Sequence, residues 1–147
     1  MNAGGLRMTN TEVFNLGQQV LEAQSFSKLL GAELVEFKEG EVVFEIPIRE
    51  NLLQHHGFVH GAVLSFAADN ALTFVGGTVL GAEIITSEYK INYLRPAIGE
   101  KLIARGTVIS SGRRQAVCRC DVFAVKDNEE KLCATAIGTI VTFTKGD

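Results

Sequence analysis

The sequence predicts an α+β fold in which an antiparallel β-sheet curls around one long, apolar helix. Residues 60–80 form an apolar run whose hydrophobic side chains would surround a helix on all sides, so other structure must cover nearly every face. The residues after this run are rich in β-forming side chains and are divided by turn residues. A sheet of about six strands can cover such a helix by curling around it, although other α+β topologies fit the same pattern.

The chain before the apolar run supplies one helix and two strands. Apolar residues recur mostly three or four apart between residues 9 and 30, which is typical of an amphipathic helix. Residues 33–37 and 41–48 read as two strands, because the second alternates apolar and polar side chains and a short charged turn with a glycine separates them. A loop over residues 49–59 then leads into the central helix.

The second half of the chain is predicted to be almost entirely strand. Gly76 and Gly77 are expected to weaken or end the central helix. Strands follow at residues 84–94, 101–110, 115–125 and 131–143. No internal repeat or linker interrupts the 147 residues. We therefore expect one domain over residues 1–147, with residues 1–30 as its N-terminal helical segment.

Charge, cysteines and the N-terminus indicate a cytoplasmic protein without a nucleic-acid or membrane partner. The formal net charge is −3, whereas a nucleic-acid surface is normally basic. Cys118, Cys120 and Cys133 lack C-x-x-C spacing and read as reduced thiols, the first two packing on one strand face. The N-terminus lacks the basic start and apolar core of a signal peptide. Polar residues interrupt the apolar run, which favours a buried helix over a membrane span.

Asp69 is the charged residue that most needs an explanation. It stands inside the apolar run with no basic residue within one helical turn. An unpaired buried charge is costly, and desolvated carboxylates are good bases, so this placement is typical of a functional site. Thr73, one turn later, would share its helix face and could hold the carboxylate or a water. The alternative is that hydroxyls or backbone donors simply satisfy Asp69 at an interface.

The start of the same helix carries His60 and Gly61. The first backbone N–H groups of a helix have no intrahelical partner and lie at its positive end, where they can stabilise an oxyanion. Gly61 would let a carbonyl group approach closely, or it only serves a tight loop entry. His56 and His60 have a spacing that metal sites use, but Gly57 lies between them and no third ligand is evident, so we expect no metal. His55 and His56 are expected near the mouth of the site.

Several motifs together resemble a known family. These are Gln54, then His60-Gly61-Ala62, Asp69 nine residues after His60, Ser87 in the following strand, and residues 92–97 (NYLRPA). Over almost the whole chain the sequence is similar to the phenylacetyl-CoA-thioesterase-like branch of the 4-hydroxybenzoyl-CoA thioesterase superfamily, whose fold is the hot-dog fold. Two positions depart from the commonest pattern of the family. That pattern has a second glycine where this chain has Ala62, and often an asparagine where this chain has Gln54.

The resemblance implies an acyl-CoA thioesterase that works as a homodimer, with a dimer of dimers as a further option. It implies that the Gly61 N–H polarises the thioester carbonyl and that Asp69 of the other subunit attacks it or activates water. Gln54 would orient the carboxylate, water or carbonyl, while Thr73 and Ser87 are further site candidates. No cofactor is expected, because CoA is part of the substrate.

Two further assignments come from the residues themselves. Ser87 is expected on the strand face that meets the central helix, either in the site or as a core hydroxyl satisfied by backbone. Arg95, Arg113 and Arg114 are candidates for the CoA phosphates, because the guanidinium fork suits phosphate. The remaining alternatives are an acyl-CoA hydratase or dehydratase on the same scaffold and a non-catalytic acyl-CoA-binding module. The sequence lacks a hydratase-like His followed by a Pro-Gly-rich helix entry, which disfavours the hydratase. It also lacks a basic DNA-reading helix before the first strand, which disfavours a regulatory module.

Overall fold

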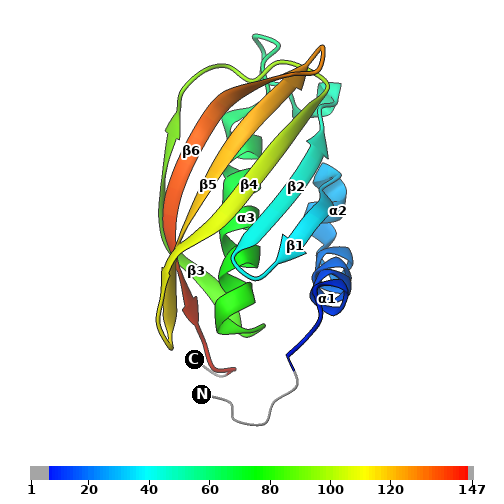
Figure 1. The fold of residues 1–147 in the computed structure, drawn as a ribbon. Helices are drawn as coiled ribbons and strands as arrows, with labels where there is room; N and C mark the ends of the chain where they lie inside the picture. Colours follow the sequence, from blue (N-terminus) through cyan, green and yellow to red (C-terminus); the bar gives the residue numbers. More distant parts are fainter. Residues whose placement is uncertain (1–6, 146–147) are drawn as a thin grey trace.

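A computed structural model describes residues 7–145 and confirms the predicted α+β architecture, an antiparallel sheet wrapped around a central helix (Figure 1). The helices are α1 (Asn10–Ala23), α2 (Ser25–Leu30), the short 3₁₀ helix η1 (Glu50–Leu52) and α3 (Gly61–Leu80). The strands are β1 (Glu33–Lys38), β2 (Glu41–Pro47), β3 (Ile84–Tyr93), β4 (Lys101–Ser111), β5 (Gln115–Lys126) and β6 (Glu129–Thr142).

The six strands form one sheet in the order β1-β2-β4-β5-β6-β3, and every neighbouring pair is antiparallel. The sheet curves around α3, while α1 and α2 lie beside the β1 edge (Figure 1). Strand β3 forms the opposite edge, and within residues 7–145 its outer side pairs with nothing. An open edge of ten residues is a ready site for pairing with another chain.

The N-terminal segment differs from the single helix expected over residues 9–30. A capping box joins Thr9 and Glu12 at the start of α1, which explains why the helix begins there. Gln24 adopts an extended backbone conformation, with φ −93° and ψ 101°, and divides the segment into α1 and α2. The break lets α1 lie along β1 as a separate element.

The sequence predicts that Gly76 and Gly77 weaken or end the central helix; they do not end it, because α3 continues to Leu80, the end of the predicted apolar run. A Cβ atom at Gly76 would lie 2.9 Å from three side-chain carbons of Ile140. Gly138 is similarly enclosed, since a Cβ atom there would meet the Cβ of Tyr89 at 2.6 Å. These glycines let the helix and the neighbouring strands approach β6 closely, which is a packing role and not a helix stop.

The core lies between α3 and the concave face of the sheet. Cys118 and Cys120 point into it from β5 and are fully buried, as expected for small hydrophobic side chains. Burial raises the pKa of the Cys118 thiol to about 11 and raises that of Cys120 as well. Among the described residues, α3 is the one helix long and apolar enough to cross a membrane, and half of its apolar window is buried inside the chain.

Candidate active site

A row of residues on α3, each one turn after the last, faces strand β3. The row consists of Gly61, Ser65, Asp69 and Thr73. Strand β3 runs antiparallel to α3, and hydroxyl groups on β3 contact the residues of this row. Tyr93 donates to the carbonyl oxygen of Gly61 at 3.2 Å, and the hydroxyls of Tyr89 and Ser65 are hydrogen-bonded to each other. The seam between α3 and β3 is therefore polar, although both flanks of the helix are apolar.

The Asp69 carboxylate is held by one hydroxyl and leaves one oxygen open. Thr86 on β3 donates to Oδ1 of Asp69 at 2.7 Å. Across the described part of the chain, Oδ2 accepts no hydrogen bond and no basic side chain forms an ion pair with the carboxylate. The side chain is half-buried. Asp69 is thus fixed at one oxygen and free to act at the other.

Thr73 supports this arrangement from one helical turn away. Its hydroxyl lies 2.8 Å from the backbone oxygen of Asp69 and 2.8 Å from Oγ1 of Thr86. The predicted proximity of Thr73 and Asp69 is confirmed, but the hydrogen bond reaches the Asp69 carbonyl and not its carboxylate. Thr73 and Thr86 together form a short hydroxyl chain behind the carboxylate.

Ser87 does not face the helix as expected. The β3–β6 register shifts between Thr86 and Glu88, and this irregularity puts Thr86 and Tyr89 on the helix side. Ser87 is exposed at the shift. The hydroxyl that reaches Asp69 within the chain belongs to Thr86, which regular strand alternation places on the wrong face. No signal in the sequence marks the shift.

The N-terminus of α3 presents one unpaired backbone donor. His60 caps the helix, because its Nδ1 accepts a hydrogen bond from the N–H of Ala62 at 2.9 Å. The N–H of Gly61 finds no acceptor within residues 7–145. A Cβ atom at Gly61 would meet the Tyr93 ring at 3.6 Å, an ordinary contact, so packing inside the chain does not itself require glycine here. The amide is thus open to an acceptor from outside the described residues.

The loop before α3 is tightly folded. Gln54 donates its backbone N–H to the oxygen of Phe58 at 2.8 Å, and its side-chain Oε1 accepts from the N–H of His56. The Gln54 amide nitrogen has no hydrogen-bond partner among residues 7–145. His55 and His56 are exposed, with ring centroids 4.0 Å apart. No group of three potential metal ligands occurs among the described residues.

The three candidate phosphate-binding arginines lie at opposite ends of the sheet. Arg95 follows β3 at the end where Tyr93 contacts Gly61, and its N–H contacts the oxygen of Cys133. Arg113 and Arg114 lie in the turn between β4 and β5, where Arg114 accepts from the N–H of Thr142 beside the start of β3. Strand β4 separates the two ends by roughly 35 Å at the usual rise per residue. One chain therefore does not bring the three arginines together.

Gly61 and Asp69 are also apart within one chain. They stand eight positions apart on α3, which corresponds to about 12 Å of rise along the helix. The unpaired N–H and the open carboxylate oxygen therefore cannot serve one carbonyl group of a ligand on the same chain.

Comparisons with known proteins agree with this fold. The family model for the thioesterase superfamily matches residues 56–131. A crystal structure of a thioesterase family protein from Silicibacter pomeroyi superposes with a TM-score of 0.83 at 30% identity, over 86% of this chain and 94% of that one. A protein of Saccharolobus solfataricus is 30% identical over 129 residues, 87% of this chain and 86% of its own. The medium/long-chain acyl-CoA thioesterase YigI of Escherichia coli is 25% identical over 134 residues, 80% of this chain and 84% of that enzyme.

The curved sheet and the enclosed helix, together with these matches, define a hot-dog-fold protein of the thioesterase class. The chain belongs to the thioesterase superfamily. Membership supports thioester hydrolysis as its activity.

Proposed function

We propose that the protein hydrolyses acyl-CoA thioesters to a free acid and CoA, with Asp69 as the general base or nucleophile. The observation that carries the proposal is the Asp69 carboxylate, the one charged side chain on α3, which has one oxygen held by Thr86 and the other open. The acyl-CoA substrate class is supported by the similarity to YigI, whose name states that chemistry. No cofactor is needed for this reaction.

The chemistry requires one new C–O bond and the loss of one C–S bond. Water activated by Asp69, or Asp69 itself followed by water, attacks the thioester carbon and the carbonyl oxygen becomes an oxyanion. The Gly61 N–H at the positive end of α3 is suited to stabilise that oxyanion. CoA then departs as a thiolate and takes up a proton. Gln54, beside the helix entry, is proposed to orient the water or the carbonyl.

We propose that the working unit is a homodimer in which Gly61 and Gln54 of one subunit meet Asp69 of the other. The 12 Å rise between Gly61 and Asp69, about eight residues of helix, supports a site shared between chains. The open edge of β3 carries exposed Ile85 and Tyr93, which favours a partner there. Asn70, next to Asp69, has a buried Nδ2 without an acceptor among the described residues, so a second polar group near the carboxylate is unsatisfied. A pairing of dimers stays an expectation.

Further roles at this site follow from position. Exposed Ser87 lies on the open strand and stays a candidate for a site completed by a partner, while His60 acts by holding the helix start. Arg95, Arg113 and Arg114 stay candidates for the CoA phosphates. The unpaired cysteines are in keeping with a cytoplasmic protein.

The experiment that tests the proposal follows thiol release from a panel of acyl-CoAs with Asp69→Asn. Loss of a general base or nucleophile lowers kcat by about 10²–10⁴-fold. Circular dichroism and the oligomeric state of the variant serve as folding controls. Undiminished hydrolysis by folded Asp69→Asn would refute the proposal, and hydration of an enoyl-CoA by the wild type would favour the hydratase alternative.

A further inference from the structure

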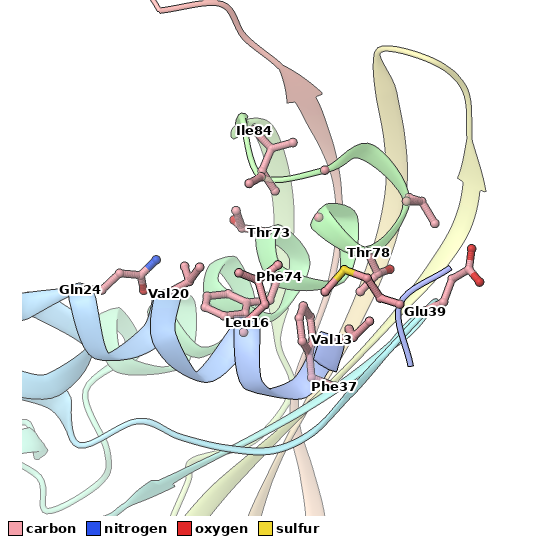
Figure 2. A pocket seen from close by; sticks show the side chains of 16 residues that line it. Val13, Leu16, Val20, Gln24, Phe37, Glu39, Thr73, Phe74, Thr78 and Ile84 are labelled. Carbon is pink, nitrogen blue, oxygen red and sulfur yellow. The ribbon is translucent and has the colours of Figure 1, made fainter. Parts of the chain in front are cut away.

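A groove of about 410 Å³ lies between α1 and the C-terminal half of α3 (Figure 2). Its walls include Val13, Leu16 and Val20 from α1, Phe37 from β1, and Phe74 and Thr78 from α3. Ile84, the first residue of β3, closes one side. The volume falls within the range of about 300–1,000 Å³ that is usual for small-molecule sites.

The groove is lined mainly by apolar side chains, and those contributed by α1 are partly exposed to solvent. Leu16 and Val20 are 45% and 40% exposed although they sit on the inner side of α1 that faces the groove. Apolar side chains gathered around a concavity are typical of a binding site for an apolar ligand. Phe37 and Phe74 meet edge to face, with ring centroids 5.7 Å apart, and form a rigid floor.

The groove is elongated. Its lining extends along α1 from Val13 and ends at Gln24, just past the helix, a span of about 16 Å at the rise of an α-helix. A volume of 410 Å³ spread over that length gives a mean cross-section of about 26 Å², so the groove is longer than it is wide. Such a groove suits a single extended alkyl chain better than a broad ring system.

The groove begins next to the candidate catalytic carboxylate. Thr73 lines it and also contacts both the Asp69 backbone oxygen and Thr86, the residue that holds the carboxylate. Asp69 lies one turn before Thr73, about 6 Å along the helix. From there the lining continues away from Asp69 through Phe74, Gly77 and Gly81. A carbonyl carbon at Asp69 would thus stand at the groove's entrance.

We infer that this groove holds the acyl chain of the substrate, that the chain is a straight aliphatic one of medium length, and that α1 limits its length. The inference rests on the proposed thioesterase activity and names its substrate class. A methylene takes up about the same 30 Å³ as a water molecule in the liquid, so a partly open groove of this size holds a chain of about eight to twelve carbons. Helix α1 closes the groove from outside, and Leu16 and Val20 set the space left for the chain.

The first measurement is kcat/KM for straight-chain acyl-CoAs from acetyl to hexadecanoyl, with benzoyl-CoA alongside. Each buried methylene contributes about 0.8 kcal/mol, or roughly a fourfold gain, until the groove is full. We expect kcat/KM to rise with chain length up to about eight to twelve carbons and then to level off. A flat profile, or benzoyl-CoA as the best substrate, would overturn the inference.

The second measurement fills the groove from α1. Val20→Trp and Leu16→Trp place an indole in the groove, and Gln19→Trp puts the same side chain on the same helix at an exposed position outside the lining. We expect both groove variants to lose about tenfold or more in kcat/KM for dodecanoyl-CoA and to keep their rate on acetyl-CoA, and Gln19→Trp to match the wild type. Equal losses in all three variants, or none in the groove variants, would contradict the role of α1.

A binding assay separates this inference from the proposed function. Calorimetry with the thioether dodecyl-CoA, which cannot be hydrolysed, should give a Kd about tenfold or more weaker for Val20→Trp than for Gln19→Trp. If Asp69→Asn abolishes hydrolysis while Val20→Trp changes neither chain-length profile nor Kd, the groove assignment fails and the thioesterase proposal stands. If Asp69→Asn hydrolyses normally while Val20→Trp still weakens Kd, the catalytic assignment fails and the groove stands.

Discussion

Thr86 offers the sharpest test of how the fold prepares Asp69. Replacing Thr86 with Val keeps the shape of the side chain and removes the hydroxyl that donates to Oδ1 at 2.7 Å. A hydrogen bond to a charged group contributes about 1.5–3 kcal/mol, so full loss of its effect on the transition state lowers kcat/KM about 10- to 150-fold. Thr73 keeps its other partner, the backbone oxygen of Asp69, so the helix itself should remain intact.

The assay is thiol release from a good acyl-CoA substrate, with kcat and KM determined separately. Thr86 contacts the carboxylate, so as a positioning residue it should change kcat and leave KM nearly unaltered. Thr86→Ser keeps the hydroxyl and should recover most of the activity. Ser87→Ala removes the neighbouring exposed hydroxyl and so separates its contribution from that of Thr86. The reasoning is refuted if Thr86→Val stays within about twofold of the wild type, or if Thr86→Ser is as impaired as Thr86→Val.

Two predictions concern stability. Burial raises the pKa of the Cys118 thiol from 9.0 to about 11, so the folded state keeps a proton that the unfolded state releases; its stabilising contribution is complete below about pH 9 and is lost as the pH rises towards 11. Urea unfolding in reductant should therefore show a smaller alkaline loss for Cys118→Ala than for the wild type, and equal losses would contradict this. Gly138→Ala should lower the free energy of unfolding by about 1–3 kcal/mol, because its methyl group would overlap Tyr89 at 2.6 Å and the oxygen of Glu88 at 2.7 Å; an unchanged urea midpoint would exclude the clash.

The sequence predicted those parts of the fold that depend on periodicity. The apolar run and the alternating strands located α3 and all six strands to within a few residues, because burial on one or two faces leaves a regular pattern. Local irregularities leave no such pattern. The extended backbone at Gln24 and the register shift between Thr86 and Glu88 each change which side chains face the core, and neither follows from composition or spacing.

The same limit governed the candidate site. Asp69 could be selected because a lone charge in an apolar helix is conspicuous, and Gly61 because helix starts have predictable unpaired donors. Thr86 could not be selected, because a one-residue shift in strand register exchanges the two faces of the strand. The groove beside α1 also escaped prediction, since it depends on how α1, packed on β1, is placed relative to α3.

The position of the groove has a consequence for the CoA end of the substrate. An acyl chain that runs from Asp69 towards the C-terminal half of α3 sends the thioester sulfur the other way, towards the N-terminal half of the helix or out across the open β3 edge. Arg95 lies at that N-terminal end, next to the strand that contacts Gly61, whereas Arg113 and Arg114 flank the end where the acyl tail would lie. Within one chain this direction favours Arg95 for the nucleotide phosphates. Arg113 and Arg114 would then reach a CoA molecule only if it is bound by the other subunit of a dimer.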